Sequence, residues 1–455
     1  MSRSFALADA VPAALLRLVA RFVPQGAVLL SVLTFGSYAL GLLRDRIFAR
    51  TFGAGSELDA YNAAFVLPEL TLDVLVASGL AAPFIPIFTR LRGVDEASAI
   101  EFGRSVLTVA VLVMVGAVGV LFAIAPETAA IVAPGFDARE RALYTDLFRV
   151  MCLTPILFAA SIALGEILVA HHRFLFYGLA PLLYNAGIIA GTVLFAERLG
   201  IFGAAIGAVL GATLHLAIRI VGIAGTTFRY RPSLRVRTAA FAEFIRLMIP
   251  KMASHPIEPF MFLFFTALAS TFGAGSVSAV NFARNFQSVP VALIGISFSL
   301  AVFPNLSAAY ASGDRDAFVR ILRANLVAIG GLATVAAVGL YLTGGLVLEL
   351  FLGGGAFDAA DVALTSLVLA AFALSIPFDS LTHPLSRALY ATRNTLLPVA
   401  ASLGGLVVTL AVATGLAPSA GVVSIPLAFT AGAATKTVLL ALALVPRVER
   451  IGRSG

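Results

Sequence analysis

Three kinds of residue are scarce in this chain of 455 residues: tryptophan is absent, cysteine occurs once, and charged residues make up only 12%. The scarcity of charge, with a mean hydropathy of +0.99, excludes an ordinary soluble protein and is typical of an integral membrane protein. The lone Cys152 excludes an internal disulfide and a cysteine metal cluster, and we expect it to pack as a small apolar side chain. No nucleotide-binding P-loop and no catalytic triad are found, so we expect neither an enzyme nor a bound cofactor or metal.

Long apolar runs dominate the rest of the sequence. A helix that crosses a bilayer needs roughly 20 mostly apolar residues. The runs are continuously apolar rather than short and alternating, which disfavours a β-barrel. We therefore predict an all-α polytopic membrane protein with about twelve transmembrane helices. The runs lie near 26–50, 57–88, 102–124, 143–170, 174–196, 201–223, 241–269, 276–309, 318–343, 360–388, 395–416 and 420–445.

The arginines indicate an orientation. If the N-terminus is cytoplasmic and twelve runs span the membrane, the inner loops hold most of the basic residues, as the positive-inside rule requires. Both termini are then cytoplasmic, and the net charge of +7 meets anionic lipid headgroups rather than nucleic acid. The inner set is Arg3, Arg17, Arg21, Arg90, Arg92, Arg173, Arg229, Arg231, Arg235, Arg237, Arg315, Arg320, Arg323, Arg387, Arg393, Arg447, Arg450 and Arg453.

The first 25 residues do not resemble a cleaved signal peptide. Arg17 and Arg21 lie on one face of a predicted helix and interrupt its apolar run, while Leu15, Leu18 and Phe22 lie opposite. We expect residues 1–25 to form an amphipathic helix on the cytoplasmic membrane surface.

The chain contains an internal repeat. "FGAGS" occurs at 52–56 and again at 272–276, followed by a proline and then by "FIPIFTRL" and "VFPNLSAAY", respectively. Six spans per half make the halves parallel repeats about an axis along the membrane normal, with a central cavity between them, which is a transporter architecture. The domains that follow are a first lobe (26–225), a basic linker (226–240), a second lobe (241–445) and a basic tail (446–455).

The run "GLLRDRIFARTFGAGSELDAYNAAFVLPELTLDVLVASGLAAPFIPIFTRL" resembles the amino-terminal signature of the MurJ (MviN) family, the lipid II flippases of the MOP superfamily. "RFLFYGLAPLLYNAGII", "FRYRPSLR", "NFARNFQSVPVALIGISFSLAVFP" and "SRALYATRNTLLP" match later family landmarks in order. The resemblance covers about residues 26–445. Members usually have fourteen spans, so we expect the last helical pair to be absent here.

The resemblance implies a cationic cavity that receives the diphosphate and sugar headgroup of lipid II. Arg44 and Arg284 are expected to approach this cavity from opposite lobes, and guanidinium groups bind phosphate through charge-assisted hydrogen bonds. An alternative is that Arg44 pairs with Asp45 or Asp59 to hold helices together. The predicted substrate-binding residues are Arg44, Asp45, Asp59, Arg284, Asn281 and Ser288.

The sequence departs from the family pattern where carboxylates replace basic or amide residues. Tyr38 stands where members usually have an arginine, and Glu69, Leu72 and Asp73 stand where they have asparagine and then arginine. A carboxylate repels a diphosphate and suits a cation or a proton better.

Lys251, His255 and Glu258 share one face of a helix interrupted by three prolines, and they are candidates for proton or charge coupling. The alternatives are a neutralised polar core and a lysine that snorkels to the membrane surface. With Glu69 and Asp73 they complete the predicted set of coupling residues.

We therefore expect a monomeric flippase for a lipid-linked diphosphate in the bacterial inner membrane, working by alternating access and driven by protons, sodium or the membrane potential. Two alternatives stay open: a cation-coupled exporter of small amphiphiles, and a membrane scaffold that transports nothing. The sequence leaves open the exact substrate, the coupling ion, and the effect of the absent last helical pair.

Overall fold

The computed structural model describes residues 25–254 and 257–452. Within these ranges every regular element is a helix, apart from one isolated bridge between Gly354 and Phe357, which confirms the predicted all-α class. The predicted amphipathic segment 1–25 and tail 446–455 lie partly outside the described residues, as does His255.

The described residues of the first half form nine α-helices and one short π-helix. They are α2 (Gln25–Phe52), α3 (Ser56–Leu72), η1 (Asp73–Ala77, π), α4 (Ser78–Val94), α5 (Glu96–Ala123), α6 (Ala125–Val132), α7 (Ala138–Met151), α8 (Leu153–Ala170), α9 (Phe174–Leu199) and α10 (Phe202–Ala224).

The second half has the same kind of organisation. Its elements are α11 (Ala239–Ser254), α12 (Ile257–Ala269), η2 (Ser270–Phe272, 3-10), α13 (Ser276–Pro290), η3 (Val291–Ile296, π), α14 (Ser297–Ala311), α15 (Arg315–Phe351), α16 (Ala359–Ala373), α17 (Ile376–Ala391), α18 (Leu396–Ala420), η4 (Gly421–Val423, 3-10) and α19 (Ser424–Glu449).

Each of the twelve predicted apolar runs coincides with one of these helices or with consecutive ones. In the described part of the chain, eight stretches are long and apolar enough to cross a membrane, and α16 with α17, bent by 42°, makes a ninth. One of the eight, Leu396–Glu449, contains both α18 and α19. The structure is therefore consistent with twelve spans, although fewer stretches are by themselves long and apolar enough to cross a membrane.

The repeat seen in the sequence is also a repeat of irregular structure. In each half a proline inside a helix is followed by a π-helix: η1 begins five residues after Pro68, and η3 begins directly after Pro290. Proline removes a backbone donor and disturbs the regular ladder, so a local π-turn beside it has a direct cause.

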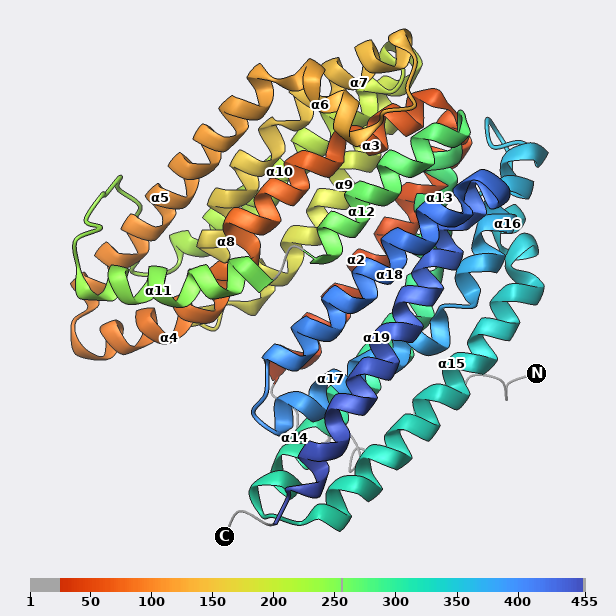
Figure 1. Cartoon of the computed structure of the whole chain (residues 1–455). Helices are drawn as coiled ribbons and strands as arrows, with labels where there is room; N and C mark the ends of the chain where they lie inside the picture. Colours follow the sequence, from red (N-terminus) through yellow and green to blue (C-terminus); the bar gives the residue numbers. More distant parts are fainter. Residues whose placement is uncertain (1–24, 255–256, 453–455) are drawn as a thin grey trace, which may run out of the picture.

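The two halves meet at one end of the molecule, which we call the glycine-loop end because it carries both "FGAGS" loops and the loop 352–358. Figure 1 shows α3, α13 and α16 close together there, while α4 and α14 lie far apart toward the other end. We call the other end the basic end; it carries the loops 93–95, 171–173 and 225–238. One helix of the second half, α11, packs along α4 of the first half.

Glycines allow close approaches at two places. A Cβ atom on Gly191 of α9 would lie 2.2 Å from the Cα atom of Gly207 on α10, so these helices pack backbone to backbone. In the second "FGAGS" loop, Gly275 has φ +85° and its missing Cβ leaves room for the carbonyl oxygen of Ala54. Cys152 is free and buried, as predicted.

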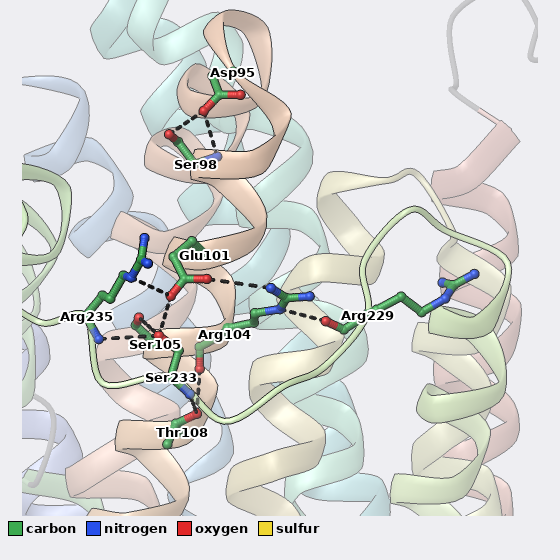
Figure 2. A network of polar contacts seen from close by, with 9 residues as sticks. All are labelled: Asp95, Ser98, Glu101, Arg104, Ser105, Thr108, Arg229, Ser233 and Arg235. Carbon is green, nitrogen blue, oxygen red and sulfur yellow. Dashed lines mark hydrogen bonds and ion pairs between the residues drawn. The ribbon is translucent and has the colours of Figure 1, made fainter.

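The linker between the halves is tied to the basic end of α5 rather than hanging free. Glu101 accepts a hydrogen bond from Ser233 and forms ion pairs with Arg104 and Arg235, as Figure 2 shows. Phe228 of the linker is fully buried. The linker and the first half therefore form one connected unit.

The start of α5 is capped in the same region. Asp95 accepts hydrogen bonds from the backbone N–H groups of Ala97 and Ser98 and from the Ser98 hydroxyl (Figure 2). Because these bonds stabilise the charged carboxylate, they lower the pKa of Asp95.

Candidate functional site

A cavity of about 730 Å³ lies between the two halves. Its wall comes from α2, α3, η1, α8, α9 and α10 of the first half and from α12 and α13 of the second. This volume is within the usual range for small-molecule sites. Of the predicted site residues, those that line it are Arg44, Asp45, Glu69, Asp73, Glu258 and Asn281.

Arg44 is the basic centre of this wall. Its guanidinium group donates two hydrogen bonds to Asp45 Oδ1, at 3.1 and 2.8 Å, and one to Asn185 Oδ1 at 3.3 Å. The other oxygen of Asp45 accepts a hydrogen bond of 2.8 Å from Asn285 of the second half. Arg44 therefore has both of the expected features: it faces the cavity, and it pairs with an acidic neighbour that connects the halves.

Arg284 does not share that wall. Its guanidinium lies between the rings of Phe262 and Phe429, 4.5 and 4.6 Å from their centroids, and contacts Glu258 at 3.4 Å. It borders a void of about 10 Å³ that has Phe262, Thr266 and Asn281 in common with the main cavity. The expected approach of both arginines to one cavity is thus absent in this conformation, because two aromatic faces hold the second cation.

Asp59 also lies away from the cavity. Its side chain accepts hydrogen bonds from Gly275 N (2.7 Å), Ser278 N (2.7 Å) and Ser278 Oγ (2.6 Å), and the residue is only 1% exposed. These donors form the first turn of α13, so Asp59 caps a helix of the opposite half. Instead of facing substrate, it joins the halves at the glycine-loop end.

The basic residues that crowd the end of α2 have a similar role. Arg46 donates to the carbonyl oxygen of Phe351 at 2.8 Å, and Arg50 donates to that of Gly353 at 2.8 Å. Both carbonyls lie at the C-terminus of α15, where a cation satisfies unpaired acceptors and the helix dipole. The backbone N–H of Ala54 donates to Asp361 at 3.0 Å and adds a further contact between the halves.

The remaining predicted residues are dispersed. Ser288 donates to the carbonyl oxygen of Asn285 in its own helix and does not line the cavity. Lys251 lies on α11 and is absent from the wall, whereas Glu258 on α12 belongs to it. Of the two described members of the predicted Lys-His-Glu stripe, Lys251 and Glu258, the structure brings Glu258 to the cavity.

A polar group in the first half was not predicted. His215 lines the cavity, and its Nδ1 lies 2.7 Å from Ser161 Oγ. Arg219, one turn further along α10, donates to the carbonyl oxygen of Ser161 at 2.8 Å and stacks over Tyr177. Gly165 provides the space for this guanidinium. The signal was present in the sequence: two polar residues spaced i, i+4 in an otherwise apolar helix.

The charge of the cavity wall differs from the cationic wall expected. Among the described residues that line it there is one arginine against four carboxylates. The carboxylates are Asp45, Glu69, Asp73 and Glu258.

The comparisons with known proteins agree with this architecture. The family model described as "Lipid II flippase MurJ" matches residues 48–454. The chain belongs to the lipid II flippase MurJ family. MurJ proteins are membrane transporters and not enzymes, so the expectation of a non-enzymatic multi-pass protein is confirmed.

Among relatives, a probable lipid II flippase MurJ of Thermotoga maritima is 28% identical over 423 residues, covering 92% of this chain and 84% of the relative. One of Rickettsia prowazekii is 24% identical over 388 residues, covering 84% and 76%. A solved lipid II flippase MurJ in an inward closed conformation superposes with a TM-score of 0.81 at 23% identity, covering 94% of this chain and 90% of that one.

A multidrug MATE transporter structure in an inward-facing conformation has a TM-score of 0.79 at 14% identity, covering 92% of this chain and 96% of that one. An outward-facing MATE structure has a lower score of 0.66, also at 14% identity, with 94% and 97% covered. These similarities show that this chain has the MOP-superfamily fold.

Proposed function

We propose that this MurJ protein moves lipid II, or a lipid-linked diphosphate of the same class, between the leaflets of the bacterial inner membrane. The observation that carries the proposal is the cavity between the halves, with Arg44 in its wall. An amphiphile has a polar headgroup that the bilayer core excludes. A polar chamber between two lobes shields that headgroup while the lipid tail stays in the membrane.

The mechanism we propose is alternating access. Asp59, Arg46 and Arg50 join the halves at the glycine-loop end, and α4 and α14 diverge toward the basic end. With the basic loops on the cytoplasmic side, as the positive-inside rule favours, this is an inward-facing state with both termini cytoplasmic.

In this proposal Arg44 contacts the diphosphate, since a guanidinium fits two phosphate oxygens at once and stays charged. Asp45 orients Arg44 and couples it to the second half through Asn285. Arg284 joins the site only when movement of the halves releases it from Phe262 and Phe429. The transporter acts as a monomer, and coupling to protons, sodium or the membrane potential involves the carboxylates of the wall.

A second candidate function is export of small cationic amphiphiles. It is favoured by one observation, the excess of carboxylates over arginine in the cavity wall. Such an exporter would not require Arg44, whereas a flippase for a diphosphate would.

The test is rescue of a bacterium depleted of its own lipid II flippase, combined with a measurement of lipid II translocation. Arg44→Ala should abolish rescue at equal expression. The matched control is Arg198→Ala, which removes an exposed arginine at the end of α9, outside the cavity wall. Rescue by the Arg44→Ala variant would contradict the flippase proposal. The proposal would also be contradicted if the wild-type chain failed to rescue growth and instead exported cationic drugs in response to acid.

A further inference from the structure

The polar wall of the cavity has separate acidic and basic parts. Arg44, the basic part, already has a carboxylate partner in Asp45 at 2.8 Å. Glu258 has a partial partner in Arg284 at 3.4 Å. Glu69 is exposed to the cavity and accepts no hydrogen bond from any residue that the structure describes. Among the described carboxylates of the wall, Glu69 is therefore available to a positively charged group of a ligand.

The local structure explains why two of these carboxylates face the cavity together. Glu69 and Asp73 are spaced i, i+4, so they lie one turn apart on one face of the segment. Their neighbours Pro68 and Leu72 are buried, and Leu72 also borders the cavity. The π-helix η1 begins at Asp73, and such wide turns often occur at functional sites.

These carboxylates lie near enough to the basic part to act on one ligand. Glu69 is within electrostatic range of Arg44 and of Asp73, and Tyr184 lies near both Glu69 and Arg44. A purely anionic headgroup at Arg44 would be repelled by Glu69. A headgroup with a positive group beside its phosphates would be attracted at both places.

We propose that the cavity selects a headgroup that carries a primary ammonium group in addition to its diphosphate, and that Glu69, assisted by Asp73 and Glu258, is the specificity-determining residue. The inference rests on the proposed function and refines its substrate class. A lysine-type amine has a pKa near 10.4 and is charged at neutral pH. Such an amine donates charge-assisted hydrogen bonds to carboxylates while Arg44 binds phosphate.

The experiment uses the purified full chain and two synthetic probes. Both are polyprenyl diphosphates that carry the same disaccharide, one with a free primary amine and one with that amine acetylated. Binding to each is measured at constant ionic strength. The wild-type chain should bind the amine probe at least about tenfold more tightly, which corresponds to about 1.4 kcal/mol.

Variants assign this preference to the acidic wall. Glu69→Gln should reduce the preference to less than about twofold and leave binding of the acetylated probe unchanged or improved, since a repulsive charge is lost. Asp73→Asn should reduce it in part. The matched control Glu197→Gln, an exposed carboxylate outside the cavity wall, should keep the full preference.

The outcomes separate the inference from the proposed function. If wild type binds both probes equally while Arg44→Ala weakens both, the ammonium site is refuted and the flippase proposal stands. If Arg44→Ala leaves both probes unaffected, the flippase proposal fails and the inference fails with it. If sodium or pH changes probe binding through Glu69 and the amine does not, the carboxylates serve a coupling cation, and the inference is overturned.

Discussion

Replacement of Asp59 by asparagine should open the glycine-loop end. The carboxylate accepts three hydrogen bonds from the first turn of α13, two from backbone N–H groups and one from a hydroxyl. Asparagine keeps one acceptor oxygen, so one buried N–H loses its partner at a cost of about 1–3 kcal/mol. Loss of the negative charge at a helix N-terminus costs about 0.3–2 kcal/mol more.

The sum is about 3 kcal/mol in favour of separation, which shifts the equilibrium between joined and separated states about a hundredfold. Spin labels at Arg198→Cys and Ser419→Cys, both exposed at the glycine-loop end, report the separation by pulsed electron resonance. The native Cys152 is buried, so it should not take up label.

The matched control is Asp137→Asn. Asp137 also caps a helix, accepting from Glu140 N at 2.8 Å, but both residues belong to the first half. It should lower stability without separating the labels. The reasoning would be refuted if Asp59→Asn kept the wild-type distance distribution, or if Asp137→Asn widened it equally.

Three further predictions concern packing, pH and the linker. Gly191→Ala should lower thermal stability, by about 1–3 kcal/mol, because its Cβ atom would overlap the facing helix; a melting experiment with no shift contradicts this. The ion pair with Arg90 lowers the pKa of Glu243, so its contribution is present above the ordinary glutamate pKa and disappears only when the pH falls through the lowered value. Spin labels on α4 and α11 should therefore stay close in mild acid and separate only when the pH falls through the lowered pKa. Glu243→Gln should make the distance between the labels independent of pH. Glu101→Ala should release Ser233 and speed tryptic cleavage of the linker, whereas unchanged cleavage would show that the contacts do not hold it.

Sequence reasoning predicted the features that depend on local pattern. The apolar runs predicted the helices, and the repeated "FGAGS" loops with their following prolines predicted the two corresponding halves. The pairing of Arg44 with an acidic residue was predicted as an alternative, with Asp45 or Asp59 as the partner, and the structure shows Asp45. The all-helical membrane class and the family were therefore accessible before any coordinates.

Long-range contacts were not accessible in this way. Arg284 is held by Phe429, which is 145 positions away in the sequence, and no helical periodicity reveals such a partner. Two of the three donors to Asp59 are backbone N–H groups at the start of a distant helix, which have no side-chain signature. We predicted from the sequence that Arg284 and Asp59 contact the substrate, whereas their positions depend on how the two halves pack in this conformation.

The most direct test of alternating access is a reversible lock at the glycine-loop end. Asn62 Nδ2 and Ser278 Oγ lie 3.3 Å apart across the two halves, so Asn62→Cys with Ser278→Cys should form a disulfide on oxidation. In vesicles that contain the purified chain, we expect oxidation to stop translocation of fluorescent lipid II and reduction to restore it. Each single cysteine variant should be insensitive to oxidant. Full transport by the cross-linked protein would contradict the account.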